Sequence, residues 1–280
     1  MLENGYVLTG IHNGRKYVVE KKIGHGGVAY VYLVHDDENL KYALKISEDL
    51  ISITREHKVL TSLRNCNFAP RVFDLDDALL YNKMYHYIVL EYIEGYSLDR
   101  LIKSGIDLES ASYIFAEILD ALIVLKRLGI FYTDLKPSNV MVDEIKKRIV
   151  LIDYGSTSAK DDTVKEFTHE FDRASWKVGL RKADSGYLSF EAGMLFVCLV
   201  MGKTFRYDYY NTIGEVLKQS KGRLGKFYIV IMKALNGAYD INKLYINFKN
   251  GCFSEKASMY LNYVLLIVGM IFVVLMILAV

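Results

Sequence analysis

The sequence predicts an α+β fold of two lobes, a small β-rich N-terminal lobe and a larger helical lobe. Runs rich in β-branched and aromatic residues occupy the first third of the chain, whereas helical spacing dominates beyond residue 186. A third observation is a C-terminal run of apolar residues that is long enough to span a membrane. The predicted parts are an N-terminal segment (1–16), an N-lobe (17–92), a C-lobe (93–250), a juxtamembrane linker (251–260) and a transmembrane tail anchor (261–280).

The composition is that of a folded protein without a strong charge bias. Of the 280 residues, 52% are hydrophobic and 24% are charged, and the formal net charge is +2. This near-neutral balance does not indicate nucleic acid as a partner. Cys66, Cys198 and Cys252 are too scattered for a metal pattern or a disulfide framework. No signal peptide is seen in the polar N-terminal residues, so a reducing, cytosolic setting is expected for the globular part.

The strands of the N-lobe are predicted first. Residues 16–36 contain two β-rich runs joined by glycines, and residues 40–47 form a third alternating run. Helical spacing follows in residues 52–65, and strand character returns in residues 84–95. We expect the chain to cross between the lobes near Glu91 to Gly95.

The C-lobe begins with a long amphipathic helix over residues 108–130. Two short strands, residues 139–143 and 148–155, flank a turn at Lys146 and Lys147. The basic stretch "KQSKGRLGK" (218–226) is predicted as a solvated surface loop in preference to an anion-binding patch. An anion-binding patch would lose affinity steeply with added salt.

The tail anchor is predicted from residues 261–280. This segment, "LNYVLLIVGMIFVVLMILAV", has no charged side chain, and at 1.5 Å per residue it matches a hydrocarbon thickness of roughly 30 Å. Lys249 and Lys256 precede it, which favours a cytoplasmic location for the globular part. We therefore expect a single-pass protein of the cell membrane.

Four distant segments carry groups suited to nucleotide chemistry. Gly24, Gly26 and Gly27 lie in a strand-to-strand turn, where backbone N–H groups can approach phosphate oxygens. Lys45 ends the apolar run "YALKI" and needs a carboxylate partner, which Glu56 offers on the next helix. Taken singly, each feature is better explained by a structural role.

The other two segments follow the long predicted helix. The loop "YTDLKPSN" fixes the spacing of Asp134, Lys136 and Asn139, and Asp153 ends the buried run "LID". A polar turn between a helix and a strand is the alternative explanation for the loop. Asn139 and Asp153 supply the hard oxygen ligands that Mg²⁺ takes alongside phosphates.

Together, these segments resemble the Hanks-type serine/threonine protein kinases over residues 17 to about 250. "KEFTHEFDRASWKVGLRKAD", "ALNGAY" and the apolar tail are similar to the tail-anchored YabT-type kinases of spore-forming Gram-positive bacteria, which associates the chain with sporulation. The resemblance implies the bilobal protein-kinase fold, ATP with Mg²⁺ or Mn²⁺ as cofactors, and protein substrates with serine or threonine acceptors. The lysine of "DLKPSN" indicates serine/threonine specificity.

The resemblance also implies a role for each matching residue. Asp134 would accept the proton of the substrate hydroxyl, Lys136 would stabilise the transferring phosphoryl group, and Lys45 would hold the α- and β-phosphates, positioned by Glu56. Asn139 and Asp153 would hold the metal ion. The residues expected around ATP are Ile23, Gly24, His25, Gly26, Gly27, Val31, Ala43, Lys45, Leu90, Glu91 and Ile93.

Four positions depart from the family pattern. Ala29 stands at the third glycine, and Thr133 replaces an arginine that commonly pairs with a phosphorylated activation loop. Residues 174–176 read "ASW" in place of "APE", and Leu188 occupies the place of an aspartate that braces the catalytic loop. We hypothesise that activity does not depend on loop phosphorylation through Thr133.

The segment from Ser156 to Trp176 is expected to be the activation loop, with autophosphorylation in trans. Its candidate sites are Ser156, Thr157, Ser158, Thr163, Thr168 and Ser175. Two other functions stay open at this point. A pseudokinase would bind ATP as a scaffold without transferring phosphate, and a small-molecule kinase would share the fold, although the intact "DLKPSN" argues against it.

Overall fold

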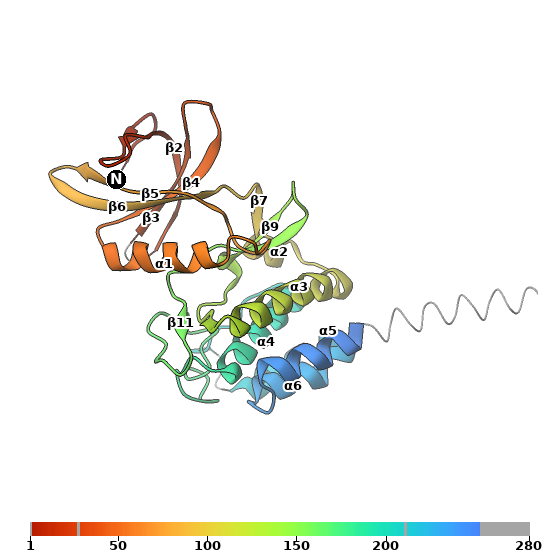
Figure 1. The fold of residues 1–280 in the computed structure, drawn as a ribbon. Helices are drawn as coiled ribbons and strands as arrows, with labels where there is room; N and C mark the ends of the chain where they lie inside the picture. The colour runs from red at the N-terminus through yellow and green to blue at the C-terminus, as the bar shows by residue number, and fades with distance from the viewer. Residues whose placement is uncertain (1, 27–28, 210–211, 253–280) are drawn as a thin grey trace, which may run out of the picture.

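The computed structural model describes residues 2–26, 29–209 and 212–252, which form two lobes (Figure 1). One lobe is a six-stranded antiparallel sheet with helix α1 packed on it, and the other lobe is mainly helical. The predicted α+β, bilobal organisation is thus confirmed for the described residues. The elements of the N-lobe are β1 (Val7–Thr9), β2 (Lys16–His25), β3 (Ala29–His35), β4 (Lys41–Ser47), α1 (Leu50–Ser62), β5 (Val72–Leu80) and β6 (Lys83–Glu91).

The N-lobe sheet has the order β1-β2-β3-β4-β6-β5, and its first strand lies before residue 17. The segment 1–16, predicted as separate, contributes β1 and buries Leu2 and Leu8 in a core of this lobe. The loop after β1 then reaches the far edge of the sheet, where His12 and Asn13 donate backbone N–H groups to Asp76 on β5 at 2.9–3.2 Å. These bonds join the two edge strands, so the segment is an integral part of the lobe.

Strand β5 was missing from the predicted elements. Its sequence, "VFDLDDALL", places three aspartates among apolar residues and so does not show plain alternation. Asp74 and Asp76 are nevertheless buried, because Tyr17, Asn13 and the backbone amides near residue 12 bind them. Hydrogen bonds from the distant N-terminal segment therefore offset the cost of burying carboxylates in this strand.

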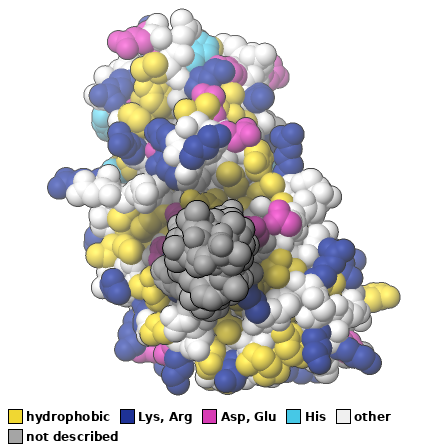
Figure 2. Space-filling view, turned by 90° about the vertical axis from the view of Figure 1, so that its right-hand side faces the viewer, with side chains coloured by type: hydrophobic (Ala, Val, Ile, Leu, Met, Phe, Trp, Pro, Cys, Tyr) yellow, Lys and Arg dark blue, Asp and Glu magenta, His cyan; other side chains and the backbone are white. Residues whose placement is uncertain are grey.

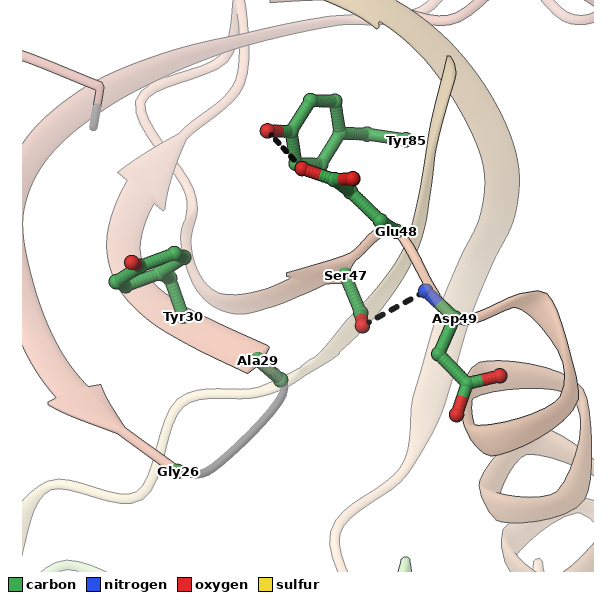
Figure 3. Close-up of a pocket in the computed structure, with 7 residues that line it drawn as sticks. All are labelled: Gly26, Ala29, Tyr30, Ser47, Glu48, Asp49 and Tyr85. Carbon is green, nitrogen blue, oxygen red and sulfur yellow. Dashed lines mark hydrogen bonds between the residues drawn. The ribbon is translucent and has the colours of Figure 1, made fainter. Parts of the chain in front are cut away.

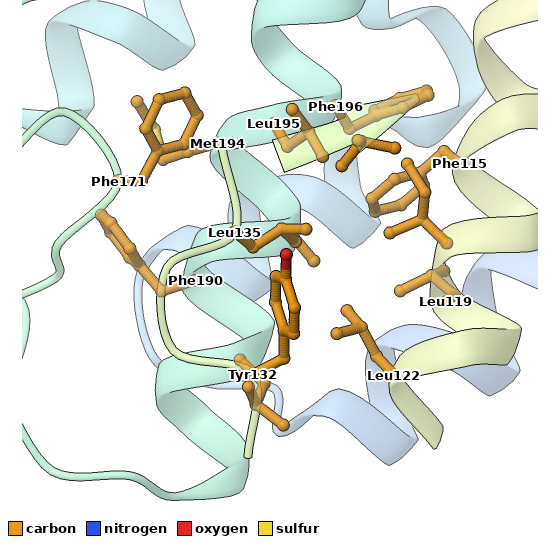
Figure 4. Close-up of a cluster of buried hydrophobic side chains, with 14 of the residues drawn as sticks. Phe115, Leu119, Leu122, Tyr132, Leu135, Phe171, Phe190, Met194, Leu195 and Phe196 are labelled. Atoms are coloured by element: carbon orange, nitrogen blue, oxygen red, sulfur yellow. The ribbon is translucent and has the colours of Figure 1, made fainter. Parts of the chain in front are cut away.

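The C-lobe is built around α4, whose apolar sequence is buried continuously from Tyr187 to Val200. Asp184 caps the N-terminus of α4, and Gly202 ends it with a φ of +69°. In Figure 4, side chains of α3, α4 and the loop after Phe131 pack together. The elements of this lobe are β7 (Gly95–Ser97), α2 (Leu98–Ser104), α3 (Leu108–Arg127), β8 (Ile130–Phe131), η1 (Pro137–Asn139), β9 (Val140–Asp143), β10 (Arg148–Leu151), β11 (Ser158–Ala159), α4 (Ser185–Met201), α5 (Ile213–Leu224), η2 (Gly225–Phe227), α6 (Tyr228–Leu235) and a helix over residues 241–252.

The prediction of a surface loop at residues 218–226 is wrong. These residues form the end of α5 and the short helix η2. Ile213, Val216 and Leu217 are buried together with Ser220 and Leu224, a spacing that lays one face of α5 on the C-lobe. The basic side chains occupy the opposite, exposed face, so the stretch is solvated as expected although it is helical.

The predicted transmembrane segment, residues 261–280, lies outside the described residues, as does most of the linker before it. Within the described ranges, none of the helices combines the length and the apolar character that crossing a membrane requires. The tail anchor therefore stays a prediction.

The junction between the lobes depends on a glycine. Gly95 opens β7 opposite Asp143 on β9, and a Cβ atom at this position would lie 1.8 Å from the Val142 carbonyl oxygen. We expect Gly95→Ala to separate β7 from β9 and to lower the free energy of unfolding by about 2–3 kcal/mol. Urea denaturation measures the change.

Gly222→Ala is the matched control for this substitution. Gly222 lies within α5 and has open space around its Cα, so alanine there should stabilise the fold by about 0.5–1 kcal/mol. A Gly95→Ala protein as stable as the wild type would show that the close backbone approach is not a constraint.

Candidate active site

A cavity of about 600 Å³ opens between the two lobes, and both lobes supply its walls. The glycine turn and the strands β2 to β4 lie on one side, and the loop around η1 and the end of β10 lie on the other. Of the residues expected to contact a nucleotide, Gly27 lies outside the described residues. The others all line this cavity: Ile23, Gly24, His25, Gly26, Val31, Ala43, Lys45, Leu90, Glu91 and Ile93.

Two apolar residues of the cavity wall were absent from the predicted site. Met141 on β9 and Ile152, just after β10, line the same cavity as Val31 and Ala43. Apolar side chains supplied by both lobes suit a flat aromatic ring such as adenine. The sequence gives little indication of this role, because Met141 lies within the run "NVMVD", where any apolar residue fits a buried strand.

Lys45 forms the centre of a buried ion-pair cluster. Its Nζ atom lies 2.7 Å from Glu56 Oε2 on α1 and 2.9 Å from Asp153 Oδ1 beyond β10. Burial alone would lower the pKa of Lys45, but the charges of Glu56 and Asp153 outweigh it and raise this pKa. Burial likewise opposes ionisation of Asp153, yet Lys45 lowers its pKa. Lys45 and Asp153 thus favour each other's charged forms, and their ion pair ties the N-lobe to the C-lobe.

Three side chains donate hydrogen bonds to the Asp134 carboxylate. Oδ2 accepts from Lys136 Nζ at 2.6 Å and from Asn139 Nδ2 at 3.1 Å, and Oδ1 accepts from the Thr168 hydroxyl at 3.0 Å. These donors fix the direction of the carboxylate beside the cavity, which Lys136 and Asn139 also line. Thr168, which was predicted only as a candidate phosphorylation site, thus belongs to the site. A side chain held this way can accept a proton from an incoming hydroxyl.

Each of the two predicted metal ligands has an oxygen atom that is suitable for binding a cation. Asn139 uses its Nδ2 to donate to Asp134, which turns its carbonyl Oδ1 away from those bonds. Lys45 and Gly155 both bind Oδ1 of Asp153, and among the described residues no bond to Oδ2 is found. One amide oxygen and one carboxylate oxygen on the same cavity fit Mg²⁺, which keeps few protein ligands and several waters.

The side chain of Glu91 forms ion pairs with the C-lobe, whereas its backbone is the part expected to bind the nucleotide. Its carboxylate pairs with Lys146 and Arg148 of the C-lobe, and its N–H donates to the Arg71 carbonyl at 2.8 Å. Burial would raise the pKa of Glu91, but the bonds from Lys146 and Arg71 and the charge of Arg148 lower it. Because this N–H is occupied, the backbone of Glu91 can offer the adenine ring only its carbonyl oxygen.

The start of the activation segment is held by neutral contacts. The hydroxyl of Thr133, which replaces the expected arginine, donates to the Ser156 carbonyl at 2.8 Å and lies 3.2 Å from Ser158 Oγ. Ser158 also pairs with Phe131 in the small β8–β11 sheet. Here this end of the segment is positioned without a phosphate group.

A local ion-pair system holds the other end of the activation segment. Arg181 Nε bonds the fully buried Asp172 at 2.8 Å, and Arg173 bonds Asp184 at 2.6 Å. The Tyr187 hydroxyl lies 3.2 Å from Asp172 as well. These pairs lie directly around the "ASW" stretch and stabilise the segment where the family's usual glutamate is missing.

A second, smaller hollow of about 420 Å³ lies on the other side of the glycine turn (Figure 3). Its acidic side chains already have structural partners. Tyr85 donates to Glu48 at 2.7 Å, and Asp49 caps α1 by accepting from the Ile51 and Ser52 amides. We assign no ligand to it.

Comparison with known proteins agrees with this geometry. The chain matches the protein kinase domain family over residues 17–221. It is also 33% identical over 246 residues to the serine/threonine-protein kinase YabT of Bacillus subtilis (strain 168), a match that covers 85% of this chain and 72% of YabT. The chain belongs to the serine/threonine protein kinases. The resemblance seen in the sequence is thereby confirmed, and this kinase is a phosphotransferase.

Similarity to other relatives covers less of the kinase. The serine/threonine-protein kinase PknG of Mycobacterium leprae (strain TN) is 31% identical over 156 residues, which is 51% of this chain but 20% of PknG. The probable serine/threonine-protein kinase PknB of Bifidobacterium longum (strain NCC 2705) is 28% identical over 55% of this chain and 24% of its own. These larger proteins share only a part with the kinase described here.

Proposed function

We propose that this kinase transfers the γ-phosphoryl group of ATP to serine and threonine hydroxyls of cytoplasmic proteins while anchored to the cell membrane. The observation that carries the catalytic part is the arrangement of the polar groups. Lys45, Glu56 and Asp153 form one ion-pair cluster, and Asp134 forms a second cluster with Lys136 and Asn139. Lys136 and Asn139 line the same cavity as Lys45 and Asp153. A scaffold that only binds ATP has no use for an oriented carboxylate such as Asp134.

The proposed chemistry is positioning and charge neutralisation. Gly24 and Gly26 would cover the phosphates of ATP, Lys45 would bind the α- and β-phosphates, and the carbonyl of Glu91 with the backbone of Ile93 would hold adenine. Bound Mg²⁺ would neutralise phosphate charge from its site at Asn139 and Asp153. Asp134 would orient the acceptor hydroxyl and take its proton, and Lys136 would offset the charge on the transferring group.

The catalytic proposal is tested with the purified full-length chain, radiolabelled ATP and Mg²⁺. We expect label on the kinase itself and on added protein substrates, with phosphoamino acid analysis giving phosphoserine and phosphothreonine. Chelation of the divalent cation should abolish the incorporation. Binding of ATP without any transfer under these conditions would favour a pseudokinase, and label on a small molecule alone would favour the small-molecule kinase.

The proposed membrane anchor is supported by the sequence of residues 261–280 and by the charge that precedes it. Within 20 residues before this segment the chain carries Lys243, Lys249 and Lys256 against Glu255, and positive charge beside a span favours the cytoplasmic side. Figure 2 views the molecule from the side on which the described residues end, and Lys and Arg side chains are spread over both the upper and the lower part of this face.

Two arginines placed in the apolar segment test the anchor in the full-length chain. Ile271→Arg with Val274→Arg should move the kinase from the membrane pellet to the supernatant, because each arginine costs about 2.5–3.5 kcal/mol near a helix centre. The control carries leucine at both positions and should stay in the pellet after alkaline extraction. Equal fractionation of the two variants would refute the anchor.

A further inference from the structure

Glu191 is a buried carboxyl group that the proposed chemistry does not use. It lies on α4 with 1% of its surface exposed, one helical turn after Leu188. Its Oε1 accepts a hydrogen bond from the Leu135 N–H at 3.2 Å, while Oε2 has no hydrogen-bond partner among the described residues. A carboxyl group in an otherwise apolar helix is costly to bury. Its single bond to the catalytic loop therefore needs an explanation.

The bond reaches the peptide group that carries Asp134. The C=O of this peptide belongs to Asp134 and accepts from Asn139 Nδ2 at 2.9 Å, and the N–H belongs to Leu135 and donates to Glu191. Both polar groups of one peptide plane are thus held from different elements, η1 and α4. Because a peptide group is planar, fixing its two ends fixes the backbone direction at Asp134.

The packing of the Leu135 side chain adds no directional restraint on this peptide. The Leu135 side chain is fully buried and lies beside α4 in the cluster of Figure 4, a contact that is apolar and without direction. Burial and the charge of Asp134 raise the pKa of Glu191, which favours its neutral form. A neutral carbonyl acceptor holds the Leu135 N–H without placing a second negative charge beside Asp134.

We propose that Glu191 is a positioning residue, which fixes the Asp134–Leu135 peptide from α4 and takes over the bracing role that Leu188 cannot perform. Only the expected change in kcat rests on the proposed phosphoryl transfer. The restraint on the Leu135 amide is a property of the fold and can be measured separately.

The test compares Glu191→Gln with Glu191→Met in the full-length chain. Glutamine keeps a neutral oxygen acceptor, whereas methionine keeps the length of the side chain and removes the acceptor. We expect kcat to fall less than threefold for Glu191→Gln and at least tenfold for Glu191→Met, with KM for ATP within twofold of the wild type in both. Hydrogen exchange at the Leu135 amide should be slow in the wild type and the Gln variant and at least tenfold faster in the Met variant.

Two results would overturn the inference. One is unchanged Leu135 exchange in Glu191→Met, which counts against it whatever the activity. The other is a loss of kcat in Glu191→Gln as large as that in Glu191→Met. Should the Met variant fail to fold, a tenfold loss in Glu191→Gln or fast Leu135 exchange in the wild type still refutes the proposal. A wild type with a protected Leu135 amide but no phosphate transfer would refute the proposed function and leave this inference standing.

Discussion

Asp134→Asn is expected to lower kcat by about 10²- to 10⁴-fold, the usual contribution of a general base. The asparagine Oδ1 can still accept from Lys136 and Asn139, and its Nδ2 can donate to the Thr168 hydroxyl oxygen, so the loop geometry should survive. It cannot take up the proton of the acceptor hydroxyl. Initial rates of phosphate incorporation at saturating ATP measure the effect, and the Kd for ATP should change little because Asp134 lies beside the nucleotide site.

The matched control for this substitution is Asp208→Asn. Asp208 is an exposed aspartate of the same lobe that forms an ion pair with Arg206, so its removal should leave kcat unchanged. Equal rates for Asp134→Asn and the wild type would mean that Asp134 is not the base, and would revive the scaffold interpretation. Comparison of the two aspartates separates loss of the base from a general effect of charge removal.

Local patterns, taken together with the family resemblance, predicted the segments that carry the chemistry. A glycine turn, a lysine ending an apolar strand and an aspartate after a buried strand each break the rules of their own element. Such exceptions are visible without knowledge of the fold. These exceptions indicated Lys45 and Asp153, and the family resemblance added Asp134. The structure places all three at one cavity or directly beside it.

The partners of buried charges were the part that sequence alone did not reveal. Glu191 is the one charged residue in the sequence of α4, but only the fold brings Leu135, 56 positions earlier, against it. The carboxylates of β5 likewise depend on the amides of His12 and Asn13, about sixty residues away. A local pattern contains no information about which distant donor meets a buried acceptor, and so both features were missed.

The error at α5 had a different cause. Its three basic residues, with Lys226 just after it, drew attention to charge, although Ile213, Val216 and Leu217 already showed a helical stripe. Charge density describes the solvent face of a helix and does not distinguish a helix from a loop. The hydrophobic spacing was the more informative signal in this segment.

Lys45→Met is expected to reduce both activity and stability. Loss of the phosphate contact should lower kcat at least about 10²-fold, a typical effect of deleting one charge-stabilising group. Removal of Lys45 also leaves Glu56, whose side chain is fully buried, without its cation. We expect the free energy of unfolding to fall by about 3–5 kcal/mol near pH 8, because an unpaired buried charge is strongly destabilising.

The pH dependence of this loss identifies its origin. Burial already raises the pKa of Glu56 against the opposing charge of Lys45, and without Lys45 this pKa should rise further. A carboxyl group with a raised folded-state pKa destabilises the fold as pH rises through that pKa and costs little below its ordinary value. Urea unfolding of Lys45→Met should therefore show a smaller deficit at pH 5 than at pH 8.

The double variant Lys45→Met with Glu56→Leu separates structure from catalysis. Replacing both members of a buried ion pair by apolar residues is often neutral for stability, so the double variant should recover most of the lost unfolding free energy. Its kcat should stay as low as that of Lys45→Met, because the phosphate-binding cation is still missing. A double variant that regains activity would show that the lysine acts only by neutralising Glu56, and a single variant whose stability does not change with pH would show that Glu56 is not the destabilised group.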